Sequence, residues 1–385
     1  MSELFFSRAE FDERQNRVRR VMQKRGIELL LVISPINIHY LVGSATKAYQ
    51  AFQCLFFPLE EPRPNLLLLR LSDVAEALDV SLVQDVRGWN GRCYEDPLEV
   101  FRSILREKGW LNKRIGLETP SYYLSVTDYL KMKAVLGEAP VVEATHLIEE
   151  IRVVKSPAEL RYVRAAAGIA DVGLEAIADT LAVGLNELEV AAAAHSAMMS
   201  TGGESPPSPM NFVSGERTCY GHGRPTDRVM RHGDFVHAEW GGQFRRYCAT
   251  LGRHFSLGPP SARAKELHEV TSDACDAYIG SVKAGVSFAR PHRAAAQVIA
   301  KAGFAEFSLH ESGYGIAPGF PPGWGESMSV FDEGSCTLQE GMVISVEPPI
   351  LIHAEHIGAR LIDCLIVHDH WAEVLSKQPR ELVVV

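Results

Sequence analysis

Hydrophobic residues in the first 150 positions follow two alternating patterns, helical spacing and short continuous runs. A capping box at Ser7 opens a stretch of apolar residues at helical spacing that ends at Gly26. The next helix of this kind is expected over 97–108. Apolar runs predict buried strands at 29–33, 66–69 and 115–117. This alternation predicts a small α/β domain over residues 1–152.

The pattern changes near residue 150, where longer helical stretches are grouped with strand-like pieces. Ser156, Pro157 and Glu159 predict a helix start, and an Ala-rich helix follows to about residue 181. Further helices are predicted over 186–202, 261–283 and 290–301, and strands over 212–213, 235–239, 247–255, 342–347 and 361–368. Helices combined with antiparallel hairpins predict an α+β domain over residues 153–385.

One predicted hairpin, residues 233–255, places a carboxylate among apolar neighbours. Its glycines, Gly241 and Gly242, predict the turn between the two strands. With a period of two, Phe235, His237 and Glu239 share one face of the first strand. A buried carboxylate without a partner is costly, so Glu239 either pairs with another residue or meets a ligand.

Composition removes several classes of function. A net charge of -9 and the lack of a Lys/Arg cluster argue against a nucleic-acid partner. No apolar run is long enough to span a membrane and no targeting segment is visible, so we expect a cytoplasmic protein. The seven cysteines never form a CxxC pair, which predicts packed thiols rather than disulfides or a zinc cluster. A nucleophilic Cys219 near His222 is the alternative.

Ionisable residues stand at strand or turn ends at four places in the second predicted domain. His222 lies between glycines, which lets it approach a ligand and exchange protons near neutral pH. Glu239 is the second place. The others are a Gly/Pro-rich loop over 310–326, with Tyr314, Trp324 and Glu326, and the segments 346–348 and 358–363, with Glu347 and Arg360. Taken singly, each of these has an ordinary structural explanation.

Together, their order resembles the creatinase and prolidase family (M24), whose catalytic domain has the pita-bread fold. The resemblance is carried by residues 151–160, the loop ending in His222, the hairpin of Glu239, the Gly-Tyr-Gly-Ile loop at 313–316, and residues 340–348 and 358–363. It implies a pita-bread C-terminal domain of the α+β class, preceded by a smaller α/β domain. It also implies a homodimer in which an N-terminal loop containing Tyr49 reaches the partner's active site.

Metal-dependent members of this family hold two metal ions on five side chains, in the order Asp, Asp, His, Glu and Glu. The corresponding positions here are Glu239, Thr250, Tyr314, Glu347 and Ile362. Thr, Tyr and Ile leave too few ligands, so the comparison implies a site without a metal or other cofactor.

Two metal-free branches of the family are similar to this chain. Bacterial ectoine hydrolases resemble it most in the Glu at position 239, the Gly-Tyr at 313–314 and the loop Pro-Pro-x-Trp-Gly-Glu, here residues 321–326. Creatinase comes next, through His222 and Glu347. The resemblance implies a metal-independent hydrolase of a non-peptide C–N bond in a small zwitterion, with ectoine or a creatine-like amidine as the leading substrates.

On this interpretation, Glu239 activates water or attacks the substrate, and His222 exchanges a proton with the departing nitrogen, with Glu347 as the third catalytic residue. The expected substrate-binding residues are Tyr314, Trp324, Glu326, Arg360, Tyr49 and Thr250. Two alternatives stay open: a metal-dependent Xaa-Pro dipeptidase or aminopeptidase of the same family, and a non-catalytic scaffold that binds peptides.

Overall fold

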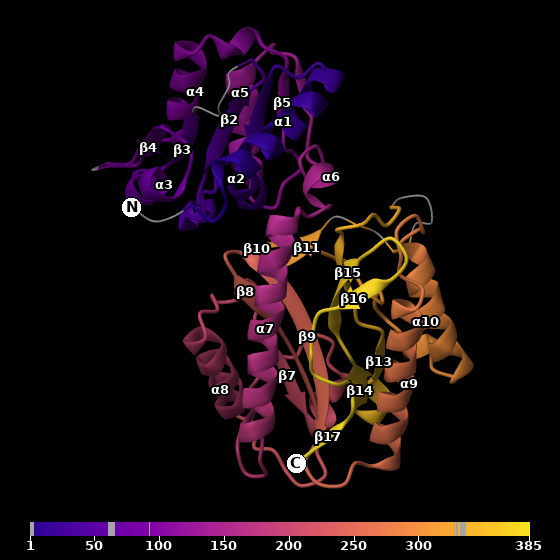
Figure 1. Ribbon diagram of the computed structural model, residues 1–385. Coiled ribbons are helices and arrows are strands. Elements are labelled where there is room, and N and C mark those ends of the chain that lie inside the picture. Colours follow the sequence, from indigo (N-terminus) through magenta and orange to yellow (C-terminus); the bar gives the residue numbers. More distant parts are fainter. Residues whose placement is uncertain (1–3, 61–65, 92, 327, 329, 332–335) are drawn as a thin grey trace. The chain divides into compact units, whose positions relative to one another are not determined.

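The chain folds into two compact units, Met1–Arg152 and Val153–Val385 (Figure 1). The computed structural model describes residues 4–60, 66–91, 93–326, 328, 330–331 and 336–385. Residues 1–3, part of the segment searched for a targeting signal, lie outside this range. Among the described helices, none has both the length and the apolar character needed to cross a membrane.

The N-terminal unit is built around one six-stranded sheet with the strand order β4-β3-β2-β1-β5-β6. Its strands are β1 (Leu29–Val32), β2 (Cys54–Pro58), β3 (Leu66–Arg70), β4 (Asp85–Trp89), β5 (Ile115–Leu117) and β6 (Val141–Glu143). Its helices are α1 (Arg8–Arg25), α2 (Pro35–Val42), α3 (Val74–Val80), α4 (Pro97–Glu107), α5 (Val126–Leu136) and α6 (Glu149–Arg152). Short 3-10 turns are η1 (Lys47–Gln50), η2 (Leu71–Asp73) and η3 (Trp110–Asn112).

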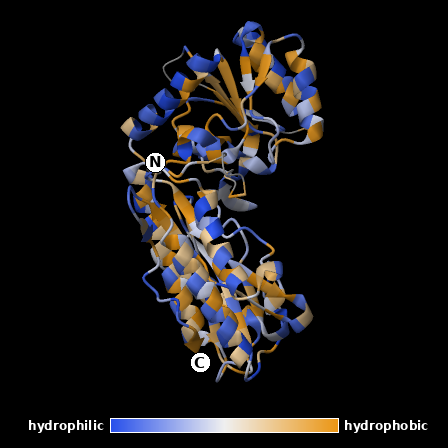
Figure 2. Cartoon of the chain, turned by 90° about the vertical axis from the view of Figure 1, so that its right-hand side faces the viewer, coloured by the Kyte–Doolittle hydropathy of each residue, from blue (hydrophilic) through white to orange (hydrophobic). Residues whose placement is uncertain are grey.

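Helices cover both faces of this sheet, which explains why β1, β2 and β3 are nearly continuous apolar runs. Leu30 and Val32 belong to one hydrophobic core together with residues of α1 and α2. Leu29 and Leu31 belong to the other, together with residues of α4 and α5. Figure 2 shows the strands of this unit largely in the hydrophobic colour, whereas the helices carry both colours. The predicted α/β character of this unit is confirmed.

The described residues of the C-terminal unit form three sheets and four long helices. A four-stranded sheet, β17-β9-β8-β7, consists of β7 (Asn211–Ser214), β8 (Phe235–Phe244), β9 (Tyr247–Ser256) and β17 (Val383–Val384). A five-stranded sheet, β11-β10-β12-β15-β16, consists of β10 (Gly315–Phe320), β11 (Gly323–Glu326), β12 (Val343–Val346), β15 (Asp363–Val367) and β16 (Ala372–Val374), and β13 (Pro349–Ile352) pairs with β14 (Ile357–Arg360). The helices are α7 (Pro157–Thr180), α8 (Glu187–Ser200), α9 (Ala262–Ile279) and α10 (Ala289–Lys301), with 3-10 turns η4 (Gly215–Cys219), η5 (Ala305–Phe307) and η6 (His353–Glu355).

Helix α7 begins where the sequence predicts. The Ser156 hydroxyl accepts a hydrogen bond from the Glu159 N–H, and the Glu159 carboxylate accepts one from the Ser156 N–H. Residues of α7 and α8 share a hydrophobic core with β7, β8 and β9, and residues of α9 and α10 share another with β12 to β15. The α+β class predicted for this unit is confirmed.

The turn of the β8–β9 hairpin lies at Arg245 and Arg246, so the prediction of a glycine turn was wrong. Both arginines have positive φ, 49° and 69°, as a two-residue hairpin turn of type I′ requires. Gly241 and Gly242 lie within β8 instead. A Cβ on Gly242 would overlap the backbone of α7, where the nitrogen of Ala170 would be 2.8 Å away. Close helix packing, rather than chain reversal, explains this glycine.

The Gly/Pro-rich stretch over 310–326 is also more regular than the sequence suggests, because β10 and β11 pair as a hairpin within it. Gly319 lies inside β10, where a Cβ would be 2.6 Å from the ring of Pro207. Close packing therefore explains why a glycine is needed at this position.

The prediction that the cysteines are packed thiols holds for five of the seven. The buried ones are Cys54, Cys219, Cys248, Cys275 and Cys364, whereas Cys336 is half-buried and Cys93 is exposed.

Two glycine substitutions, one inside the contact between α7 and β8 and one outside it, test whether close packing requires Gly242. We expect Gly242→Ala to destabilise the protein by about 1–3 kcal/mol, because the new methyl group overlaps helix α7. Gly168→Ala, on the exposed side of α7 with nothing within 4 Å, should stabilise it by about 0.5–1 kcal/mol. Thermal unfolding followed by circular dichroism measures both, and an unchanged midpoint for Gly242→Ala would contradict the packing argument.

Candidate active site

A pocket of about 330 Å³ in the C-terminal unit brings together six of the residues predicted from the sequence. These are His222, Glu239, Tyr314, Trp324, Glu326 and Glu347. Its other lining residues are Ser208, Asn211, His310, Glu311, Gly323, Gly325 and Met328. Arg360 and Thr250 are buried and do not line it, although Arg360 contacts Glu239. Tyr49 lies in η1 of the N-terminal unit, and its relation to the pocket stays a prediction.

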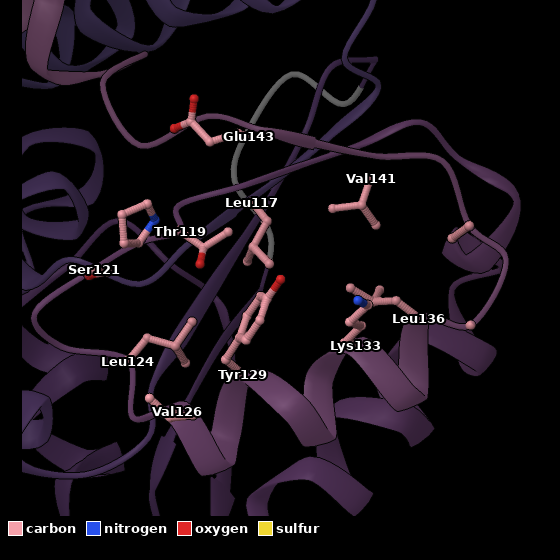
Figure 3. Close-up of a pocket in the computed structure, with 13 residues that line it drawn as sticks. Leu117, Thr119, Ser121, Leu124, Val126, Tyr129, Lys133, Leu136, Val141 and Glu143 are labelled. Atoms are coloured by element: carbon pink, nitrogen blue, oxygen red, sulfur yellow. The ribbon is translucent and has the colours of Figure 1, made fainter.

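A larger cavity, of about 880 Å³, lies in the N-terminal unit beside α5, β5 and β6. Figure 3 shows its wall, in which Leu117 and Leu136 are buried and Tyr129 and Lys133 supply polar groups. Among the described residues that line it there is no histidine, and the one carboxylate, Glu143, is exposed. Size alone would favour this cavity, but buried ionisable groups gather only in the smaller of the two. We therefore take the smaller pocket as the active-site candidate.

Backbone hydrogen bonds at the start of β10 and the end of β12 hold two of the pocket side chains in place. The N–H of Glu347 donates to the carbonyl of Ser312 at 2.8 Å, and the N–H of Ser345 donates to the carbonyl of Tyr314 at 2.8 Å. Tyr314 therefore comes directly before β10, and Glu347 comes directly after the neighbouring strand β12, on the same side of the sheet.

Trp324 and Tyr314 form one wall of the pocket. The indole Nε1–H of Trp324 donates to the Tyr314 hydroxyl at 3.0 Å, which leaves the phenol proton of Tyr314 to be donated elsewhere. The Trp324 ring lies against Gly241 of β8, where a Cβ would be 3.0 Å from the ring. Glu326 also lines the pocket, but its carboxylate forms a buried ion pair with Lys155 at 3.1 Å.

Glu239 has a charged partner within the protein. The Nη2 of Arg360 donates to Oε2 of Glu239, and also to the carbonyl of Gly221 at 2.6 Å. Burial is the largest single influence and opposes the ionisation of Glu239, but the Arg360 guanidinium, His237 and Asn211 together outweigh it and lower the pKa of this carboxyl to about 2. Arg360 therefore pairs with Glu239 inside the protein, whereas Asp363 pairs with Arg253 at 2.8 Å.

The carboxyl of Glu347 differs from that of Glu239, because its pKa is shifted in the opposite direction. Its side chain is 2% exposed, and Oε2 has no hydrogen-bond partner among the residues that the structure describes. His310 comes within 3.6 Å of Oε1, but its Nδ1 donates to the carbonyl of Glu311 at 2.8 Å. Burial raises the pKa of Glu347 well above its usual range, although Arg360 opposes the rise. Glu347 therefore keeps its proton to a higher pH than an ordinary carboxyl does.

His222 completes the set from the loop that follows η4. Partial burial and the positive charge of Arg360 lower the pKa of His222 below its usual value, so the imidazole is neutral at pH 7. The pocket thus combines a carboxyl with a lowered pKa, a carboxyl with a raised pKa and a neutral imidazole. Groups whose protonation states differ in this way are suited to proton transfer in both directions.

Asn211, His310 and Glu311 line the same pocket, although the sequence did not assign them a role. Asn211 lies opposite Glu239 in the register of β7 and β8. Only the strand pairing reveals this neighbour, because 28 positions separate the two residues. His310 and Glu311 belong to the loop that the sequence did single out.

Comparison with known proteins identifies the family. The chain matches metallopeptidase family M24 over residues 161–369 and the creatinase/prolidase N-terminal domain over residues 14–154. It belongs to the M24 family. The prolidase from Pyrococcus horikoshii superposes with a TM-score of 0.84 at 24% identity, over 96% of this chain and 100% of that one. The predicted pita-bread fold is therefore confirmed, and the protein is a hydrolase of this family.

Characterised relatives differ in what they act on. The Xaa-Pro dipeptidase of Pyrococcus horikoshii is 30% identical over 374 residues, which cover 97% of this chain and 99% of that protein. The ectoine hydrolase of Halomonas elongata is 24% identical over 415 residues, which cover 98% of each. By overall identity the dipeptidase is the more similar of the two, which does not support the expected priority of the ectoine hydrolases.

The residues present do not fit the two metal ions of metal-dependent M24 enzymes. Ile362, in place of a carboxylate, packs against Gly252, where a Cβ would be 2.8 Å from its side chain. Thr250, in place of another, is buried, and its hydroxyl has no hydrogen-bond partner in the described part of the chain. Of the two remaining carboxylates, Glu239 is held by the Arg360 guanidinium, and burial raises the pKa of Glu347, which disfavours the ionised form that would bind a cation. This donor set lacks the bridging carboxylates that two ions require.

The raised pKa of Glu347 predicts a pH dependence of stability. A carboxyl whose folded pKa is raised stabilises the fold fully below its unfolded value of 4.5, and this contribution is lost as pH rises through the folded pKa. We expect Glu347→Gln to remove this loss, so that its unfolding temperature falls less than the wild-type value between about pH 5 and about pH 8. Thermal unfolding across this range measures the difference.

The exposed Glu306→Gln serves as the control for that measurement. It should follow the wild-type curve. Identical pH curves for wild type and Glu347→Gln would mean that Glu347 is already ionised in the folded protein.

Proposed function

We propose that the protein is a metal-independent hydrolase of a non-peptide C–N bond in a small zwitterion, either a cyclic amidine such as ectoine or a creatine-like amidine. The observation that carries this proposal is the composition of one pocket. It contains His222, Glu239 and Glu347, whereas Thr250 and Ile362 replace the carboxylates that would bridge two metal ions.

An amidinium spreads its positive charge over N–C–N, so carboxylates on either side of it form charge-assisted hydrogen bonds. Glu239 is ionised before the substrate enters, and Glu347 becomes ionised when a cation binds beside it. Tyr314 and Trp324 provide a flat wall for the ring and one phenol donor.

Two buried groups behind the pocket are suited to the substrate's own carboxylate and polar atoms. The Nε of Arg360 and the hydroxyl of Thr250 both lack a hydrogen-bond partner among the described residues. A substrate carboxylate that reaches Arg360 would satisfy the first of them. Glu326 takes part only as a wall residue, because Lys155 already compensates its charge.

The protonation states favour His222 as the group that activates water. Its neutral imidazole accepts a proton while the water oxygen bonds to the amidine carbon. His222 then returns this proton to the departing nitrogen and the C–N bond breaks. The proton of the new hydroxyl group leaves with the amine, which gives an amide and an ammonium ion. Glu239, held by Arg360 and with a low pKa, serves as a fixed negative charge rather than as a base.

Metal-dependent Xaa-Pro hydrolysis is the second candidate, supported by the names of several relatives, including the dipeptidase at 30% identity. It requires two bound divalent ions, which the donor set does not favour. A homodimer, with Tyr49 of the partner subunit near the site, and a cytoplasmic location also remain predictions. They do not decide between the two reactions.

Site variants assayed in the presence of a chelator test the proposal. We expect turnover of ectoine or creatine by the wild type and none of an Xaa-Pro dipeptide. Glu239→Gln and His222→Ala should each lose at least about a hundredfold in kcat, since both act on the reacting groups. Product formation is followed by chromatography and folding by circular dichroism. Retained turnover in either folded variant, or dipeptide cleavage that depends on added metal, would sink the assignment.

Proton release on binding tests the role of Glu347 separately. Since a cationic ligand favours the ionised form of Glu347, ectoine binding should release up to about one proton near neutral pH. Isothermal titration calorimetry in two buffers of different ionisation enthalpy measures the number released. Glu347→Gln should abolish it, whereas Glu306→Gln should not. Binding heats that are the same in both buffers would contradict this role.

A further inference from the structure

A second group of ligating side chains lies outside the pocket. In the described part of the chain, Cys219, His353 and His356 form the one set of three whose ligand atoms all lie within 4.8 Å of one another. The Cys219 sulfur is 3.8 Å from Nδ1 of His353. Cys219 ends η4 and is buried, whereas both histidines are exposed at the turn between β13 and β14. None of the three occupies a metal position of the family.

We propose that Cys219, His353 and His356 bind one zinc ion. A thiolate with two imidazoles is a donor set that divalent zinc prefers over magnesium or calcium, which favour oxygen. A sulfur and a nitrogen that share a tetrahedral zinc are roughly 3.5 Å apart, given bond lengths of about 2.3 and 2.0 Å. The observed separation of 3.8 Å needs little adjustment. Three protein ligands leave the fourth position for water.

Contacts on both sides of the proposed site hold its backbone in place before any ion binds. The N–H of Gly358 donates to the hydroxyl of Thr218 at 3.3 Å, which joins β14 to η4. Glu355, between the two histidines, accepts two hydrogen bonds from Arg263 of α9, at 2.8 and 2.7 Å. Ligands on fixed backbone lose less freedom on binding, so the site is largely preorganised.

Binding changes the protonation of one ligand. The thiol of Cys219 is partly buried, and burial raises its pKa, so it carries a proton when no ion is bound. Zinc replaces this proton, and one Zn–S bond forms for each proton released.

An ion at this position would act on the loop that carries His222. Cys219 is three residues before His222, and Gly221 between them accepts a hydrogen bond from Arg360. Zinc would therefore fix the beginning of that loop without entering the pocket. Such an ion would also appear in elemental analysis, although it takes no part in the hydrolysis.

Cobalt substitution tests the site directly. The full-length protein, stripped with a chelator, is titrated with Co²⁺ and followed by absorption. We expect a near-ultraviolet thiolate-to-cobalt band that saturates at about one equivalent and is removed by Zn²⁺. Cys219→Ser should lose this band, and His356→Asn should weaken zinc binding at least about tenfold. Cys93→Ser, which removes the exposed cysteine, is the matched control and should change neither.

Two results would overturn the proposal: no saturable band in the wild type, or a band that persists in Cys219→Ser. Circular dichroism verifies that Cys219→Ser is folded, and the exposed His356→Asn gives a second test that does not alter the core. The assay requires no substrate. The zinc site and the hydrolytic function can therefore fail independently, since turnover in chelator reports only on the pocket.

Discussion

The buried ion pair between Glu239 and Arg360 determines the properties of the pocket around it. Both side chains are almost fully buried, and removing either partner would leave an uncompensated charge at a cost of about 3–5 kcal/mol. The same guanidinium keeps Glu239 ionised, helps to keep His222 neutral, and holds the carbonyl of Gly221. One side chain thus couples the hairpin, the loop of His222 and the charges of the site.

Arg360 is itself fixed from behind by neutral histidines. Its backbone N–H donates to Nε2 of His254 at 2.9 Å, so the ring proton of His254 is on Nδ1. That nitrogen donates to Nδ1 of His268 at 3.0 Å. Burial lowers the pKa of His254 well below its usual range, which keeps the ring uncharged. The strand that carries the guanidinium is therefore held by a chain of hydrogen bonds without a competing charge.

Much of the fold could be predicted from local signals in the sequence. The capping box at Ser156 and the apolar run at 29–33 identified their elements, because caps and buried strands depend on nearby residues. The turn of the β8–β9 hairpin could not be predicted in this way. Gly242 is required by helix α7, which packs on β8 from elsewhere in the chain.

Residue types and the order of motifs were sufficient to predict six residues of the pocket, but not the protonation states of their side chains. Residue types alone do not reveal that Arg360 pairs with Glu239 while burial raises the pKa of Glu347. Those states depend on burial and on separations across strands. The grouping of Cys219 with His353 and His356 was equally hidden, because Cys219 and His353 are 134 positions apart in the sequence and no short spacing motif joins them.

The contact between Ile362 and Gly252 has a consequence for protein engineering. Gly252 leaves the room that Ile362 fills, and their backbones exchange hydrogen bonds at 3.0 and 3.1 Å. A carboxylate introduced at position 362 would take the place of an apolar side chain that packs against Gly252. Arg360 could not compensate its charge, because it already pairs with Glu239. Conversion of this pocket into a two-metal centre therefore requires several coordinated substitutions, and any single one passes through a destabilised intermediate protein.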